Sequence, residues 1–192
     1  AFQPIVNIYT GKTYALEALI RNVEEAGFHS IDALFDAAYQ DNALYALDLE
    51  LRYIALKKFA KIPFANELKL FYNIDNRITM MPDFKPGRTG EILELLGLER
   101  NDLCFELSEK HQGKFFTGID HLILNIYKQQ GYRMAIDDFG VGFSGLQMLY
   151  NAEPDFLKID RFFISGIETS RKRRLFVRSI VEIAQSLGIQ TI

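Results

Sequence analysis

Acidic, amide and amine side chains stand at the ends of five short apolar runs in this sequence. Such short runs predict buried β-strands, and the carboxyl ends of parallel strands lie on one side of a sheet. We therefore expect these side chains to surround one cavity. They are Glu17 after "YAL", Asn73 after "LFY", Glu106 after "LCF", Asp137 with Asp138 after "MAI", and Lys158 with Asp160 in "FLKID".

Clusters of oxygen ligands fit hard divalent cations, because Mg²⁺ and Mn²⁺ prefer carboxylate and amide oxygens. Two ions about 4 Å apart suit the attack of water on a phosphodiester. The second ion would share Asp137 with the first and also bind Asp138, which would turn the repulsion between adjacent carboxylates into attraction. The ligands expected for the first ion are Glu17, Asn73, Glu106 and Asp137.

Lys158 and Asp160 extend this site. Lys158 would orient the attacking water or stabilise developing charge, and Asp160, two residues on, points to the same face of the strand. A structural alternative stays open for the acidic pair, in which Asp138 caps a following turn while Asp137 forms an ion pair with Lys158.

Two further stretches have weaker functional interpretations. "SRKRR", residues 170–174, opens a helical pattern, and we interpret it as a solvated face rather than a phosphate contact. "FGVGFSG", residues 139–145, fits a GxGxxG spacing, but the two acids before it would repel a pyrophosphate. We interpret it as a loop over the site.

Strand-like runs alternate with helical periodicity along the chain, which predicts an α/β fold with helices covering a parallel sheet. An open doubly wound sheet would use only a few strands near its switch point, whereas five successive strands contribute here, which favours a (β/α)8 TIM-barrel-like fold. The expected strands are residues 2–8, 13–20, 69–74, 103–107, 133–136, 156–159 and 189–192, and the clearest helical patterns are "IDALFDAAYQ", "LDLELRYIALKKFAKI", "GEILELLGL", "GIDHLILNIYKQQG" and "RRLFVRSIVEIAQSLG".

Composition bounds the class of protein. A chain of 192 residues, 48% of them hydrophobic, predicts a single domain over residues 1–192. The net charge of -3 argues against binding to DNA or RNA polymers, which favours a basic surface. With no apolar run near ~20 residues, we expect no membrane contact by this domain. The single cysteine, Cys104, indicates a cytoplasmic location.

Six motifs in this order resemble the bacterial EAL domain and together span the chain. The three letters "EAL" alone would carry no weight, but six ordered matches are highly specific. The motifs are "QPI" at 3–5, "EALIR" at 17–21, "YNID" at 72–75, "FELSE" at 105–109, "DDFGVGFSGL" at 137–146 and "LKIDRFFI" at 157–164.

The resemblance implies a (β/α)8-like barrel that hydrolyses cyclic di-GMP to linear pGpG with two Mg²⁺ or Mn²⁺ ions. It implies the same metal ligands and the same role for Lys158 as above. It further implies that Arg21 contacts a substrate phosphate, that Gln3 and Leu19 line the ligand site, and that Glu109 holds the loop after the Asp-Asp pair. We assign Asp160 to substrate binding. The resemblance also makes plausible a homodimer that forms through that loop. It further implies upstream sensory or diguanylate cyclase-like domains in a longer parent protein, and other domains of that protein could anchor it to a membrane.

Three departures from the family pattern bear on activity. Val141 stands where Thr or Ala is usual, which we expect to be tolerated sterically. Asp75 replaces the small hydroxyl of Asn-Leu-Ser and could alter the charge near Asn73. The family continues after "LGIQTI" with a further metal-binding Glu, a strand and a helix, so we expect the native protein to continue beyond Ile192.

Three functions remain in competition. A cyclic di-GMP phosphodiesterase leads, because every family metal ligand that falls within these residues is present. The alternative is a catalytically weak or inactive cyclic di-GMP-binding regulatory or receptor module, which the departures make possible. An unrelated metal-dependent barrel acting on another phosphoester is disfavoured by the six motifs.

Overall fold

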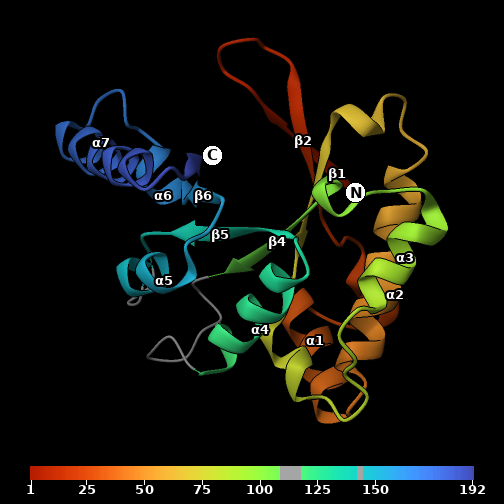
Figure 1. Ribbon diagram of the computed structural model, residues 1–192. Coiled ribbons are helices and arrows are strands. Elements are labelled where there is room, and N and C mark those ends of the chain that lie inside the picture. The colour runs from red at the N-terminus through yellow and green to blue at the C-terminus, as the bar shows by residue number, and fades with distance from the viewer. Residues whose placement is uncertain (109–117, 142–144) are drawn as a thin grey trace.

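The structure is a computed structural model that describes residues 1–108, 118–141 and 145–192. Within these residues, a 7-stranded sheet runs in chain order from β1 to β7 and curls into an open half-barrel (Figure 1). The strands are β1 (Phe2–Val6), β2 (Thr13–Ala18), β3 (Lys69–Asn73), β4 (Leu103–Ser108), β5 (Arg133–Phe139), β6 (Phe156–Ile159) and β7 (Gln190–Thr191). The expected α/β fold is confirmed, and every expected strand is present, several of them shorter.

One expectation about the sheet was wrong. Strands β2 to β7 are parallel, but β1 pairs with β2 in the antiparallel direction. The connection between Val6 and Thr13 is too short for a parallel crossover, which needs a dozen or more residues, so a hairpin is the only simple solution. The hairpin projects beyond the rest of the molecule in Figure 1.

The helices follow the predicted patterns and add two short ones after β5 and β6. Ser30 begins α1 by accepting a hydrogen bond from the Ala33 N–H, and Gly97 ends α3 in the left-handed conformation, φ 67°. In Figure 1, α1 to α4 lie to one side of the sheet, whereas α6 and α7 lie beside β6. The helices are α1 (Ile31–Gln40), α2 (Leu44–Phe59), α3 (Arg88–Leu96), α4 (Gly118–Gln129), α5 (Gly145–Ala152), α6 (Arg161–Ile164) and α7 (Arg171–Ser186), with 3₁₀ turns η1 (Val23–Ala26), η2 (Ala65–Glu67), η3 (Asn76–Met80) and η4 (Arg100–Asp102).

The two faces of the sheet carry separate apolar clusters. The larger cluster packs the sheet against the helices and includes Leu70, Phe105 and Ile136. The smaller cluster lies on the concave face, and successive side chains of a strand alternate between these two faces. Its buried members are Ala15, Phe71, Cys104, Ala135 and Phe156.

A buried charged pair lies within the larger cluster. Asp48 and Arg52 on α2 are both 0% exposed and form an ion pair one helical turn apart. The Arg52 guanidinium lies 4.9 Å from the ring centre of Phe105 and donates to Tyr127 Oη at 3.2 Å, while the Tyr72 hydroxyl donates to the Asp48 carbonyl at 3.1 Å. This network joins α2 to the face of β3 and β4 that packs against the helices.

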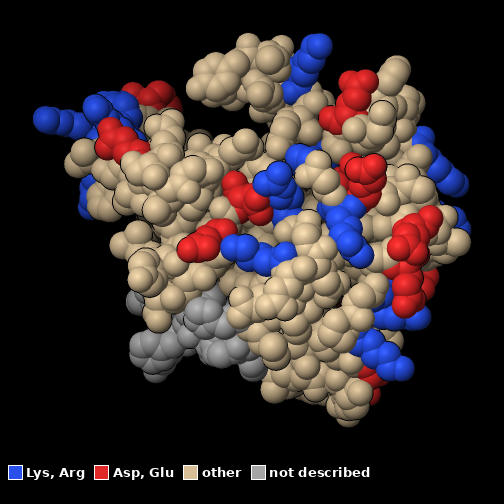
Figure 2. Space-filling model, viewed as in Figure 1, with Lys and Arg blue, Asp and Glu red and all other residues tan. Residues whose placement is uncertain are grey.

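Surface charge is mixed on the face shown in Figure 2, where Lys and Arg side chains are interspersed with Asp and Glu. Among the described residues, no helix combines the length and the apolar character that crossing a membrane requires.

Candidate metal-binding active site

The polar residues singled out from the sequence stand directly above the smaller apolar cluster. Two residues after each buried member, the same strand face carries a polar side chain, because the side-chain period of a strand is two. The apolar layer thus forms a rigid floor, and the polar side chains form a ring at the carboxyl ends of β2 to β6. The pairs are Ala15 with Glu17, Phe71 with Asn73, Cys104 with Glu106, Ala135 with Asp137, and Phe156 with Lys158.

The strand register brings three carboxylates together. Asn73 pairs with Glu106 across β3 and β4, and their side chains are hydrogen bonded, Nδ2 to Oε2, at 3.0 Å. One oxygen each of Glu17, Glu106 and Asp137 lies within 4.8 Å of the others. The sequence-based expectation that these residues meet is confirmed.

Lys158 lies in the middle of the three carboxylates. Its Nζ is 2.6 Å from Glu106 Oε1, 3.1 Å from Glu17 Oε2 and 3.1 Å from Asp137 Oδ1. Its side chain is 12% exposed. One ammonium therefore faces three acids in a place largely screened from water.

Burial and charge shift the protonation of this ring. Burial raises the pKa of Glu106 to about 8, and the nearby Asp137 and Glu17 add to the rise while Lys158 opposes it. Burial disfavours the charged form of Lys158, but Glu106, Asp137 and Glu17 outweigh this effect and raise the pKa of the ammonium above its usual value. Lys158 is therefore protonated at neutral pH.

The donor set fits a hard divalent cation. Three carboxylates on rigid strand ends supply oxygens at compatible spacing, which is the chemistry that Mg²⁺, Mn²⁺ and Ca²⁺ prefer, and a cation held by all three would take the place of the Lys158 ammonium. The Asn73 side chain turns its Nδ2 toward Glu17 at 3.3 Å and Glu106 at 3.0 Å. The same amide rotated by half a turn presents Oδ1, so it can supply a fourth oxygen.

Asp138 takes a different position from Asp137. It has a positive φ of 54°, a conformation that non-glycine residues rarely adopt. The Ser108 hydroxyl donates to its Oδ2 at 3.4 Å. Both aspartates line the cavity beside the ring.

That cavity has a volume of about 550 Å³, within the range of ligand pockets. It runs from Asn73, Asp137 and Asp138 to a wall formed by α1 and η3. Leu19, expected at the ligand site, lines it as well.

Other expected site residues lie at or near the rim. Gln3 stands opposite Glu17 in the β1–β2 register, and Arg21 donates from Nη1 to the Ile20 carbonyl at 2.9 Å. Asp160 Oδ1 accepts from the Phe162 N–H at 2.6 Å and so caps α6. Glu109 lies outside the described residues, as do residues 142–144 of the expected loop.

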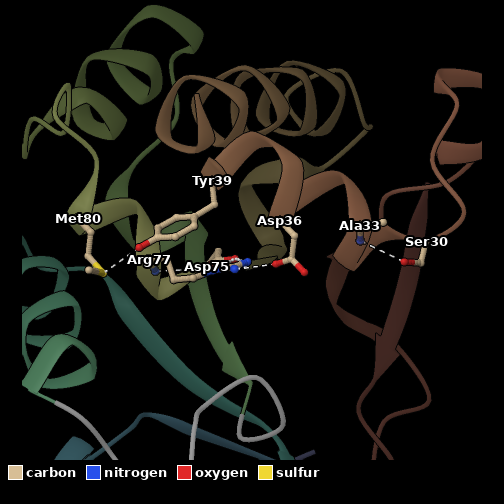
Figure 3. Close-up of polar contacts among 7 residues, drawn as sticks. All are labelled: Ser30, Ala33, Asp36, Tyr39, Asp75, Arg77 and Met80. Carbon is tan, nitrogen blue, oxygen red and sulfur yellow. Dashed lines mark hydrogen bonds and ion pairs between the residues drawn. The ribbon is translucent and has the colours of Figure 1, made fainter. Parts of the chain in front are cut away.

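The structure also shows a polar cluster that the sequence did not indicate (Figure 3). Arg77 on η3 forms an ion pair with Asp75 at 2.6 Å and with Asp36 on α1 at 2.7 Å. Its side chain also covers the ring of Tyr39 at 5.1 Å. Arg77 therefore offsets part of the charge that Asp75 introduces near Asn73. The short Asp75–Arg77 spacing was the only signal available in the sequence.

Comparison with known proteins decides the family. The family model described as "EAL domain" matches residues 1–192, the whole chain. The chain belongs to the EAL domain family. This EAL domain is 26% identical over 190 residues to the Blue light- and temperature-regulated antirepressor BluF of Escherichia coli, covering 99% of the chain and 46% of BluF. It is 31% identical over 191 residues to the Probable cyclic di-GMP phosphodiesterase PdeI of the same organism, covering 96% of the chain and 24% of PdeI.

The fold of the EAL domain is also that of solved relatives. It matches Klebsiella pneumoniae BlrP1, in a complex with calcium and cyclic di-GMP, with a TM-score of 0.84 and 26% identity. The match covers 99% of the chain and 47% of BlrP1. The chain thus spans less than half the length of all three proteins.

Proposed function

We propose that this EAL domain hydrolyses cyclic di-GMP to linear pGpG with two divalent cations, Mg²⁺ or Mn²⁺. The observation that carries the proposal is the ring of Glu17, Glu106 and Asp137 around Lys158, which adjoins a cavity of about 550 Å³ through Asp137. A solved relative, BlrP1, holds calcium and cyclic di-GMP. The membership in the EAL domain family, the cyclic di-GMP bound to the relative BlrP1 and the ring of acids together favour phosphodiester chemistry.

In hydrolysis, a water oxygen bonds to phosphorus while the bond from phosphorus to the 3′ oxygen breaks, which opens the cyclic dinucleotide. Bound cations would polarise the phosphodiester and lower the pKa of the attacking water. Glu17, Asn73, Glu106 and Asp137 would hold one cation, and Asp137 with Asp138 the other. Because this ring is set in rigid strand ends, its geometry is fixed before the substrate arrives.

The side chains around the ring would position the substrate. The Lys158 ammonium, protonated and 12% exposed, would orient water and stabilise the charge that develops on the phosphate. Arg21 would contact a phosphate at the rim, while Gln3, Leu19 and Asp160 would contact the rest of the dinucleotide. Glu109 would hold the loop after the Asp-Asp pair.

A receptor module without turnover is the second candidate function. The name of BluF describes an antirepressor, and the chain matches BluF along nearly its whole length. Against this reading, Asp75, the departure closest to Asn73, pairs with Arg77 and caps η3 by accepting from the Arg77 N–H at 2.9 Å. Arg77, which also pairs with Asp36, therefore offsets part of the charge of Asp75.

Within a longer protein, we infer a cytoplasmic domain that dimerises through the loop after Asp138 and responds to sensory or diguanylate cyclase-like domains.

The deciding experiment is chromatography of the products after incubation of the protein with cyclic di-GMP and Mn²⁺, with EDTA as the control. Metal-dependent pGpG supports the phosphodiesterase. Tight binding of intact cyclic di-GMP without product would move the protein to the receptor class. The absence of both binding and product would overturn both functions.

A further inference from the structure

The cavity continues well beyond the ring of acids, and its far wall has a chemistry of its own. α1 contributes Ile31, Phe35 and Asp36 to this wall, and η3 contributes Arg77. The first two are apolar and partly exposed, so they offer contact surface to a flat ring. The other two form the ion pair of Figure 3. Asp32 on α1 and Asn76 on η3 line the cavity as well, so the wall mixes apolar contact surface with a few polar groups, an arrangement that can orient a heterocyclic ligand.

The ion pair is held in place by Asp75. Arg77 Nε donates to Asp75 Oδ1 at 3.0 Å and Nη2 donates to Oδ2 at 2.6 Å, a two-pronged contact that fixes the plane of the guanidinium. Nη1 then reaches Asp36 Oδ1 at 2.7 Å. A guanidinium carries five N–H donors, and these contacts use three of them, so Arg77 retains donors for a ligand.

Asp36 remains open to the cavity despite this contact. Its side chain is 59% exposed, and a carboxylate accepts about four hydrogen bonds. An exposed ion pair contributes little to stability, so the Arg77–Asp36 contact by itself gives the fold little. The pair instead presents an acceptor and a donor side by side at a fixed position in the cavity wall.

We propose that Asp36 and Arg77 determine base specificity by reading the edge of a guanine. This inference rests on the proposed function, because it takes the phosphodiester at the ring of acids as the starting point. Guanine carries two neighbouring N–H donors, at N1 and N2, next to the O6 acceptor. Asp36 accepts from the two donors, Arg77 donates to O6, and Phe35 and Ile31 contact the base.

The same pair disfavours adenine. The corresponding edge of adenine has one donor, its amino group, next to the N1 acceptor. In the orientation assigned to guanine, the adenine amino group would face the Arg77 donors and N1 would face the Asp36 carboxylate, so donor would oppose donor and acceptor would oppose acceptor. The expected preference is therefore for guanine over adenine dinucleotides of the same backbone.

Equilibrium binding of cyclic di-GMP and of cyclic di-AMP, measured by calorimetry with Ca²⁺ present, tests this assignment. The proteins are the wild type, Asp36→Asn and Asp36→Ala, with Arg88→Met as the matched control. Arg88 is exposed, pairs with Glu91 and lies outside the cavity lining. Chromatography after each titration verifies that the ligand is intact.

Asp36→Asn keeps an acceptor for Arg77 but replaces one carboxylate oxygen by a donor, which suits the adenine edge. We expect the ratio of affinities for cyclic di-GMP over cyclic di-AMP to fall about tenfold or more, as for a lost two-bond base contact. Asp36→Ala should also lower the ratio, and Arg88→Met should leave it unchanged.

The outcomes separate the two proposals. If the wild type binds cyclic di-GMP but both Asp36 variants weaken the two ligands equally, or weaken neither, the base-reading role is overturned and the pair only holds α1. If the wild type binds no cyclic di-GMP, the proposed function fails and the base-reading role fails with it.

Discussion

The ammonium of Lys158 lies 2.6 Å from the carboxylate of Glu106, and the two side chains are 12% and 0% exposed. Burying the Lys158 ammonium alone would be costly, and the acids around it, Glu106, Asp137 and Glu17, offset much of that cost. The pair also sets the charge state of the ring, because Lys158 opposes the effect of burial on the pKa of Glu106.

Lys158→Met removes the only cation seen in this ring among the described residues. We expect kcat for cyclic di-GMP to fall about 100-fold or more, the usual effect of losing a group that assists proton transfer or developing charge, with a smaller change in KM. Steady-state kinetics with Mn²⁺ measures both, and Lys57→Met on α2 is the surface control. A kcat within about twofold of the wild type would remove Lys158 from the mechanism.

Metal affinity should depend on pH through Glu106. Below a pKa of about 8 this carboxyl holds a proton, which a cation must displace. The apparent affinity for Mn²⁺ should therefore rise by up to about tenfold per pH unit toward pH 8 and then flatten. Electron paramagnetic resonance of free Mn²⁺ between pH 6 and pH 9 measures this. Glu106→Gln should bind weakly with a flatter profile, and a flat wild-type profile would contradict the assignment.

Asp137→Asn keeps the shape of the side chain but removes the charge that both cations would share. Mn²⁺ affinity should fall about tenfold or more and turnover should be lost, while binding of cyclic di-GMP weakens less. Calorimetry with each ligand separates these effects. Asp83→Asn at an exposed position is the matched control. Turnover that survives Asp137→Asn at the parental rate would sink the two-cation site.

Arg21→Ala should raise KM more than it lowers kcat, because a clamp on a remote phosphate binds ground state and transition state alike. Arg21 is exposed next to Ile20, which lines the cavity. Kinetics over a range of cyclic di-GMP concentrations measures both constants. An unchanged KM would count against a phosphate contact.

Arg52→Met should lower the free energy of unfolding by roughly 3 kcal/mol, because it leaves the buried Asp48 without its partner. Urea denaturation followed by circular dichroism measures this. The double variant Asp48→Leu with Arg52→Met should recover most of the loss, since an apolar pair removes both buried charges. Equal losses in the two variants would mean that packing, rather than charge, determines the effect.

The ring could be predicted from the sequence because each of its members stands at the end of a short run of apolar residues. Glu17 and Asp137 belong to distant segments, yet the rule that parallel strands end on one side of a sheet brings them together. The alternation of residues along β1 does not indicate whether the strand runs parallel or antiparallel to β2. The short link from Val6 to Thr13 was the available clue to an antiparallel hairpin.

The contacts of Arg52 and Arg77 could not be predicted in the same way. Asp48 and Arg52, four residues apart on a helix, look like an ordinary surface pair, and only the packing of α2 against β3 and β4 buries them. The contact of Arg77 with Asp36 depends on how α1 lies against η3, which no local pattern specifies.

The ring of polar side chains above the apolar floor draws one side chain from each of five consecutive strands. A cation bound there would tie four of these strands, β2 to β5, together through Glu17, Asn73, Glu106 and Asp137, so it would bind the folded chain and not the unfolded one. Such linkage adds about 2.7 kcal/mol of stability at a free cation concentration one hundred times Kd. The melting temperature of the protein would then track the concentration of Mg²⁺ or Mn²⁺, which makes thermal unfolding a gauge of site occupancy without any substrate.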